Sequence, residues 1–229
     1  MSPDSVDTPS AGDRLMGDTR LALADACRRI IDELASSTAD SGSFSTAAAL
    51  VQQAADILEH HTHGRPYEPA EASLGSMGDY QEHLFIDHSP LVGPLNPLAP
   101  PMVFTNDGTE VTGRVTFGGA YEGPPGCVHG GYIAAAFDEV LGFAQGMSGA
   151  PGMTGRLSIS YRSPTPLHQA LEFRGDVERI DGRKIFTRGE LRVAADGRLC
   201  AEAEGLFISV KPETFQRLIT DRSASDQTG

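Results

Sequence analysis

The sequence predicts an α+β domain in which an antiparallel sheet wraps around one long central helix, with a helical extension at the N-terminus. Three observations predict this class. A helix with no breaking residue follows a Gly/Pro loop near residue 130, alternating strands separated by Asp-Gly turns follow that helix, and two amphipathic segments come first. Strands gathered around a single helix in this way are typical of α+β proteins.

Composition limits the class of partner. The 229 residues suffice for one domain plus an extension. The net charge of −13, from 18 basic and 31 acidic residues, argues against nucleic acid, because no basic stripe could neutralise phosphates. The three cysteines, Cys27, Cys127 and Cys200, are scattered and do not suggest a disulfide framework. Since neither a long apolar run nor a signal pattern is present, we expect a cytoplasmic protein without a membrane span.

The N-terminal third is expected to hold two helices. Apolar residues recur at near-helical intervals over 13–36 and again over Ser45–His61, so residues 13–63 are predicted to form a helical extension. The polar residues 1–12 are predicted to be a disordered tail. The remaining segments are a linker at 64–82, the main domain at 83–211 and a C-terminal tail at 212–229.

The main domain is predicted to contain six strands. It opens with residues 88–101, whose five prolines forbid a helix and suit an extended path over a surface. The turn Asn106-Asp107-Gly108 joins the first two strands. Regularly spaced turns at Asp181-Gly182 and Asp196-Gly197 indicate that the last four form a meander. The strands are Met102–Thr105, Glu110–Phe117, Thr154–Arg162, Ala170–Ile180, Lys184–Ala194 and Leu199–Lys211.

The central helix, starting near Gly130, has two unlike faces. At about 100° per residue, one stripe holds small residues and a single carboxylate, Asp138, while the opposite stripe is bulky and apolar. The apolar stripe suits a sheet, and the small-residue stripe allows a ligand or another backbone to come close. From the helix alone, a solvated and incidental Asp138 is an equal alternative. The front stripe is Gly131, Ala135, Asp138 and Gly142, and the back is Ile133, Phe137, Val140 and Ala144.

The start of this helix has what an oxyanion needs. A helix N-terminus offers unpaired N–H groups and the positive end of a dipole, and two glycines let a ligand approach that backbone. Such donors stabilise a carbonyl that becomes tetrahedral. A carboxylate can attack directly or activate water. Cys127 with His129 would be a rival nucleophile pair, but adjacent loop residues seldom align in that way.

These residues resemble the hot-dog-fold acyl-CoA thioesterases of the 4-hydroxybenzoyl-CoA and phenylacetate-pathway type, and especially the thioesterase-superfamily-member group. The resemblance covers roughly residues 85–210 and leaves the first 80 matched loosely or not at all. It rests on NPLAPP at 96–101, PPGCVHGG at 124–131, Asp138, Thr154, SYRSPTPL at 160–167 and DGRK at 181–184.

The resemblance implies a hot-dog fold that hydrolyses an acyl-CoA to the free acid and coenzyme A. It implies that Asp138 is the base or nucleophile, that the Gly131 N–H polarises the thioester carbonyl, and that His129 shapes the turn and bonds near the carbonyl or thiolate. The alternative for His129 is a purely structural cap of the helix. Thr154 would orient water or Asp138. The implied substrate contacts are Gly130, Asn96, Ser160, Arg162 (where a lysine is common), Gly182, Arg183 and Lys184.

No separate cofactor and no metal are expected, since coenzyme A enters as part of the substrate. The histidines at 60, 61 and 63, with His83 and His88 farther on, could bind a metal. We favour a plainer reading, because the cluster closes a helix, where histidine suits the negative end of the dipole.

The spacing predicts a shared site. Gly131 and Asp138 lie about 10 Å apart along the helix, whereas reacting atoms must come within about 3.5 Å. Two antiparallel helices in a two-fold dimer would bring Gly131 of one chain to Asp138 of the other. We therefore predict an obligate homodimer, with a dimer of dimers left open.

Two other functions stay open. One is a non-catalytic acyl-CoA or acyl-carrier binding protein on the same fold; Asp138 favours the hydrolase, because binding alone does not need that carboxylate. The other is a hot-dog hydratase, which places its Asp/His pair differently from His129 here.

Overall fold

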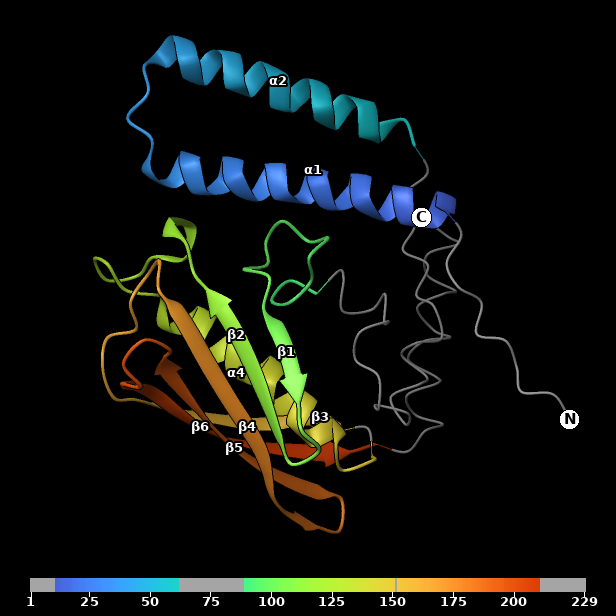
Figure 1. Ribbon diagram of the computed structural model, residues 1–229, viewed down its shortest axis with the longest axis vertical. Coiled ribbons are helices and arrows are strands. Elements are labelled where there is room, and N and C mark those ends of the chain that lie inside the picture. The colour runs from blue at the N-terminus through green and yellow to red at the C-terminus, as the bar shows by residue number, and fades with distance from the viewer. Residues whose placement is uncertain (1–10, 62–88, 151, 211–229) are drawn as a thin grey trace, which may run out of the picture.

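A computed structural model of the chain describes residues 11–61, 89–150 and 152–210 (Figure 1). Most of the predicted tail, and all of the linker at 64–82 and the C-terminal tail at 212–229, lie outside the described residues. The domain boundaries drawn in those segments therefore stay predictions.

The sheet has six antiparallel strands in the order β1-β2-β4-β5-β6-β3, and helix α4 crosses one face of it (Figure 1). The predicted α+β architecture is therefore confirmed. The elements are α1 Ala11–Ser36, α2 Ser41–Glu59, β1 Val103–Asn106, β2 Glu110–Thr116, the short 3₁₀ helix η2 Gly119–Tyr121, α4 Gly130–Gly146, β3 Gly152–Tyr161, β4 Ala170–Asp181, β5 Lys184–Val193 and β6 Leu199–Ser209.

The predicted meander of four strands is wrong in one respect. Strands β4, β5 and β6 do follow one another, but β3 pairs with β6 at the sheet edge and β4 has β2 as its other neighbour. The reason lies in the connection after β3, which makes no tight turn. It crosses to the loop before α4, where the N–H of Val128 donates to Thr165 O and that of Leu167 donates to Gly126 O. Local turn signals could not reveal this crossing.

The proline-rich stretch also differs from its prediction. Residues 89–100 form successive turns, closed by Gly93 N to Ser89 O (3.0 Å), Asn96 N to Gly93 O (3.1 Å) and Ala99 N to Asn96 O (3.0 Å). Val92 and Ala99 are buried, so the segment packs into the domain instead of running extended over its surface.

Helix α4 buries the apolar stripe that the sequence predicts. Ile133, Phe137 and Val140 are at most 2% exposed, in one core with the inner face of the sheet. Glycines let the helix come close: Gly175 and Gly189 are register partners on β4 and β5, and a Cβ on either would lie 3.0–3.1 Å from a side chain of α4. The small-residue front is open in the single chain, with Asp138 exposed.

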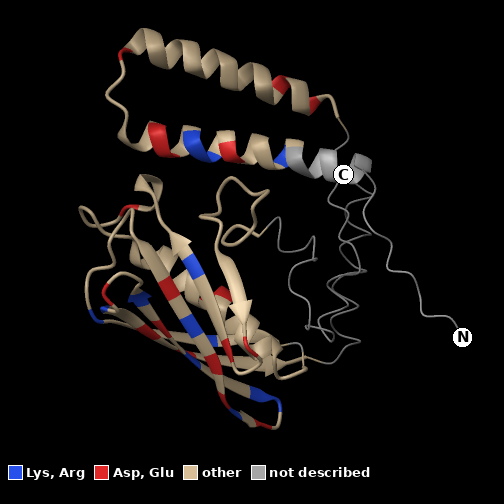
Figure 2. Ribbon diagram, in the orientation of Figure 1, with Lys and Arg blue, Asp and Glu red and all other residues tan. Residues whose placement is uncertain are grey.

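The N-terminal extension consists of two helices, as predicted. Helix α1 is fastened to the domain by Arg28, which donates to Pro94 O (2.8 Å) and Asn96 O (3.0 Å), and by Asp32, which accepts from Ala120 N (3.3 Å). Helix α2, capped by Asp40, has no buried residue, and it carries acidic but no basic side chains (Figure 2). None of the helices in the described part of the chain is long and apolar enough to cross a membrane.

Candidate active site

The loop before α4 places His129 at the N-cap of the helix. The loop closes on itself, because Gly123 N donates to Cys127 O (2.9 Å) and His129 N donates to Tyr121 O (2.9 Å). A Cβ on Gly123 would lie 2.8 Å from His129 Cα, so the closure needs a glycine there. His129 is extended (φ −62°, ψ 132°), which is the backbone conformation of an N-cap residue.

His129 caps the helix with its side chain, and this changes the predicted role of Gly131. The Gly131 N–H, predicted to polarise a carbonyl, donates to His129 Nδ1 over 3.0 Å. The N–H of Gly130, one residue earlier, makes no hydrogen bond within the described residues. The free donor at this helix end is therefore Gly130, which the sequence suggested only as a substrate contact.

Asp138 and Thr154, both expected to be catalytic, lie in hydrogen-bond contact. Thr154 Oγ1 donates to Asp138 Oδ1 over 2.8 Å. The β3–β6 register shifts between Thr154 and Arg156, at Gly155. Such bulges redirect side chains and are common beside active sites. The pair thus joins the edge strand to the middle of α4 at an open position.

Glu139 is a residue whose contacts the sequence did not reveal. It accepts a hydrogen bond of 3.0 Å from Ser89 Oγ, fifty positions earlier in the chain. Burial raises the pKa of Glu139, the Ser89 bond offsets part of that rise, and the neighbouring Asp138 charge adds to it. The helical wheel placed Glu139 on the flank, and nothing local signalled its partner.

Aromatic residues frame the N-terminal end of α4. Tyr161 donates from its hydroxyl to Gly130 O (2.8 Å), and Tyr132 packs edge-to-face on Tyr121 with ring centroids 4.9 Å apart. Alternation along β3 had placed Tyr161 with Leu157 and Ile159, the side that faces α4. That pattern was the available signal for Tyr161.

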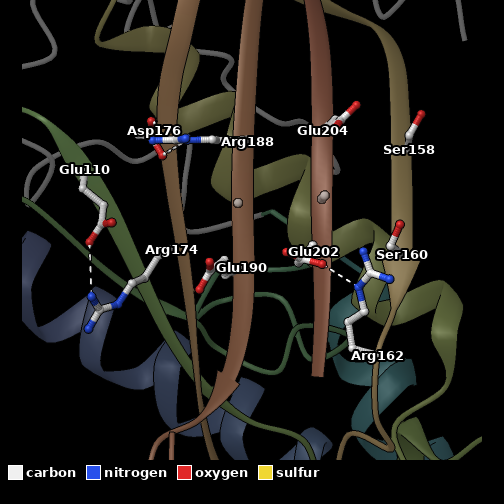
Figure 3. A pocket seen from close by; sticks show the side chains of 12 residues that line it. Glu110, Ser158, Ser160, Arg162, Arg174, Asp176, Arg188, Glu190, Glu202 and Glu204 are labelled. Carbon is white, nitrogen blue, oxygen red and sulfur yellow. Dashed lines mark hydrogen bonds and ion pairs between the residues drawn. The ribbon is translucent and has the colours of Figure 1, made fainter. Parts of the chain in front are cut away.

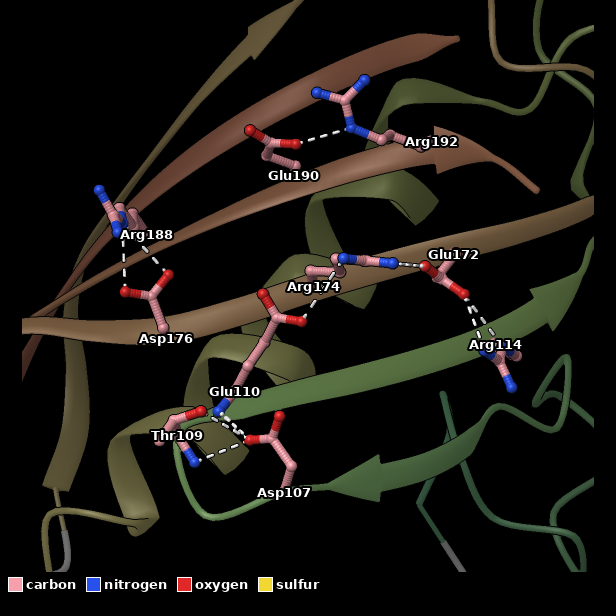
Figure 4. A network of polar contacts seen from close by, with 10 residues as sticks. All are labelled: Asp107, Thr109, Glu110, Arg114, Glu172, Arg174, Asp176, Arg188, Glu190 and Arg192. Atoms are coloured by element: carbon pink, nitrogen blue, oxygen red, sulfur yellow. Dashed lines mark hydrogen bonds and ion pairs between the residues drawn. The ribbon is translucent and has the colours of Figure 1, made fainter. Parts of the chain in front are cut away.

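The predicted coenzyme A contacts Ser160 and Arg162 lie on the sheet face away from α4. They line a groove of about 600 Å³, where Arg162 forms an ion pair of 2.5 Å with Glu202 (Figure 3). Neighbouring cations on that face are paired too, including Arg174 with Glu172 and Arg188 with Asp176 (Figure 4). Exposed pairs of this kind add little stability, but they leave few cations free for phosphate.

The predicted contacts Gly182 and Arg183 form the β4–β5 turn, and Lys184 is the first residue of β5. Lys184 and Met153 both pair with Ile208 of β6, which places this turn about 10 Å from the Thr154 end of β3. Ser160 instead pairs with Glu202, six residues along β6, or about 20 Å away. One chain therefore does not bring the two groups together.

Asn96, another predicted contact, has structural bonds. Its carbonyl accepts from Arg28, and its side-chain Oδ1 accepts from Leu98 N (3.0 Å). These bonds hold it in its turn beneath α1.

For a metal, the described residues contain no group of three or more His, Cys, Asp or Glu side chains able to hold one. His63, His83 and His88 lie outside the described residues.

Comparison with known proteins places the chain. The family model for the thioesterase superfamily matches residues 125–201. A solved thioesterase superfamily protein is 37% identical, with 82% of this chain and 94% of that chain covered and a TM-score of 0.67. The chain belongs to the thioesterase superfamily. The predicted hot-dog thioesterase fold is thereby confirmed.

Part of the chain is also similar to proteins that are named acyl-coenzyme A thioesterases. The chain is 34% identical over 113 residues to acyl-coenzyme A thioesterase THEM4 of Bos taurus, covering 49% of this chain and 46% of that protein. It is 40% identical over 91 residues to THEM4 of Xenopus laevis, covering 40% and 41%. The chain thus spans less than half the length of these relatives.

Proposed function

We propose that the protein is an acyl-CoA thioesterase that releases a free acid and coenzyme A. The observation that carries the proposal is the Asp138–Thr154 bond, on the carboxylate that α4 presents from its open face. Eight residues earlier, the same helix begins with an unpaired N–H. Similarity to proteins named acyl-coenzyme A thioesterases supports the choice of substrate.

The helix N-terminus would polarise the thioester carbonyl. The Gly130 N–H is free to donate. The Gly131 N–H, the predicted donor, would contribute by donating to the carbonyl oxygen and to His129 Nδ1 at the same time. Negative charge that develops on the oxygen is stabilised there by both the donors and the dipole. Asp138, oriented by Thr154, would attack the carbonyl or activate water. Coenzyme A would enter as part of the substrate, with no further cofactor.

Two chains would complete each site. Gly130 and Asp138 are about 12 Å apart along α4, too far to act on one carbonyl. Antiparallel α4 helices in a homodimer would place Gly130 of one protomer beside Asp138 of its partner. The same arrangement would let the 182–184 turn and the Ser160–Arg162 strand end, which are far apart in one chain, approach one coenzyme A from different protomers.

Thiol release from a panel of acyl-CoAs tests the proposal. Asp138→Asn is expected to lower kcat by about 100-fold or more, because it replaces a positioned base. The control is Asp56→Asn, which changes an exposed acid on α2 and should keep the wild-type rate. Equal rates for wild type and Asp138→Asn would overturn the mechanism. Tight binding of acyl-CoAs without turnover of any of them would instead favour a binding protein.

A further inference from the structure

Two neighbouring carboxylates on α4 are held by hydroxyl groups from different parts of the chain. Asp138 accepts from Thr154 of β3 at 2.8 Å, and Glu139 accepts from Ser89 of the proline-rich segment at 3.0 Å. Consecutive helical residues point about 100° apart. The middle of α4 is therefore tethered on two separate flanks.

Ser89 is itself fixed in its turn. Its Oγ accepts from Leu91 N (3.2 Å) and Val92 N (3.3 Å), so its hydroxyl hydrogen remains for Glu139. Val92 is 2% exposed and belongs to the core. The donor that Glu139 meets is thus a rigid one.

The far end of the same segment is bound to the N-terminal extension. The Arg28 guanidinium on α1 donates to the carbonyls of Pro94 and Asn96, and its side chain is only 14% exposed. Contacts therefore run without a break from α1, through residues 89–96, to Glu139 beside Asp138.

Glu139 is costly where it stands. Burial disfavours its charged form, and the adjacent Asp138 charge adds repulsion. An apolar side chain of similar length would avoid both costs. Stability alone does not account for a carboxylate at this position.

We propose that Glu139 is a positioning residue for Asp138. By accepting from Ser89 it fixes the rotation of α4 about its axis, so that Asp138 stays aligned with Thr154 and with the reacting carbonyl. Through the 89–96 segment, helix α1 of the N-terminal extension supports this alignment. The inference rests on the proposed thioesterase activity and adds to it a residue with no direct contact with substrate.

Four substitutions, of which Ser89→Thr is the control that keeps the hydroxyl, separate positioning from simple packing. Glu139→Gln keeps an acceptor for Ser89, Glu139→Met keeps the length without an acceptor, and Ser89→Ala removes the donor. Because one hydrogen bond to a charged group is lost, Glu139→Met and Ser89→Ala are expected to lower kcat about tenfold. KM should not change in either. Glu139→Gln should stay within about twofold of wild type, and Ser89→Thr should do the same.

Stability gives the decisive contrast. Glu139→Met should unfold at a higher temperature than wild type although its kcat is lower. A merely structural contact predicts that kcat falls only when the melting temperature falls, and that result would overturn the proposal. So would a Glu139→Met enzyme with wild-type kcat.

A second readout does not depend on turnover. The carboxyl ¹³C resonance of Asp138 should move in Ser89→Ala and return in Ser89→Thr. If wild type hydrolyses no acyl-CoA, the proposed function fails, and this resonance still decides whether Ser89 and Glu139 set the orientation of Asp138. An unmoved resonance in Ser89→Ala would overturn the inference alone.

Discussion

Thr154 Oγ1 lies 2.8 Å from Asp138 Oδ1 and donates to it across the join between the sheet edge and the middle of α4. Within the described residues no other side chain hydrogen-bonds to Asp138. The carboxylate is exposed in the single chain, so packing does not fix its rotamer. Its direction therefore depends on this hydroxyl and on how α4 is held.

Replacing Thr154 should affect turnover and leave stability alone. Thr154→Val keeps the shape and removes the hydroxyl, and a bond to a charged group corresponds to a loss of roughly 10- to 100-fold in kcat. Thr154→Ser keeps the donor and should remain near wild type. Both variants should have the melting temperature of the wild type, because Thr154 is exposed. Steady-state rates with thermal melts test this, and an active Thr154→Val protein would contradict it.

The helix-end donor can be removed with a matched control. Proline is tolerated at the first helical position, and His129 already has the extended backbone that precedes a proline. Gly130→Pro therefore deletes the N–H, while Gly130→Ala keeps it. Both variants add a Cβ that would lie about 3.2 Å from the Tyr161 hydroxyl, so they share this contact and differ in the N–H. Losing one oxyanion donor is expected to lower kcat by about 100-fold or more, so Gly130→Pro should be far slower than Gly130→Ala. Equal kcat values would exclude this N–H from catalysis.

Mixed protomers test the shared site. Asp138→Ala and Gly130→Pro homodimers each lack one half of every site. Random pairing makes about half the dimers mixed, each with one intact site, so about a quarter of the wild-type activity should return. The mixture should be prepared by co-expression and compared with each variant alone. A mixture no more active than its components would mean that both halves of a site come from one chain.

Local signals in the sequence were sufficient for most of the fold. The Asp107 turn is one example, because its carboxylate accepts from Glu110 N and Thr109 N (both 2.9 Å). The bond from Glu110, with smaller contributions from Thr109, lowers the pKa of Asp107 to about 2. Alternation located the strands, and the helical wheel identified the buried and open faces of α4, because both periodicities follow directly from backbone geometry.

Contacts distant in the sequence carried no such signal. Strand β3 lies beside β6 because its connection crosses to the loop at Val128, and Glu139 meets a serine fifty positions away. A structural cap was one of the two roles considered for His129, but the sequence did not show that the cap would take up the Gly131 N–H. The motif predicts that His129 and Gly131 are close together, but it does not predict where the imidazole points. That direction depends on the loop closed at Gly123.

The half-buried Glu139 should give the protein a pH-dependent loss of stability. Below its ordinary pKa of 4.5 the side chain is protonated in both the folded and the unfolded chain, so folding does not have to remove a charge from water. As pH rises through the raised folded-state pKa, the folded chain must ionise a group that the unfolded chain ionises more easily, so stability is lost. The melting temperature of Glu139→Gln should therefore be close to that of wild type near pH 4 and should exceed it by a growing margin toward pH 7. A difference that stays constant across this range would contradict the raised pKa.

Gly189 should be the least replaceable glycine beneath α4. Its missing Cβ would lie 2.6 Å from the carbonyl oxygen of Arg174 and 3.1 Å from Leu141, so the clash includes backbone that cannot swing aside. Overpacking at such a position costs roughly 1–3 kcal/mol, and Gly189→Ala should lower the free energy of unfolding by about that amount. Gly119→Ala is the control, because its Cβ would make an ordinary contact of 3.5 Å with Asp32 Oδ1. Urea unfolding measures both, and a Gly189→Ala protein as stable as Gly119→Ala would show that β4 and α4 can make room for the new methyl group without loss of packing.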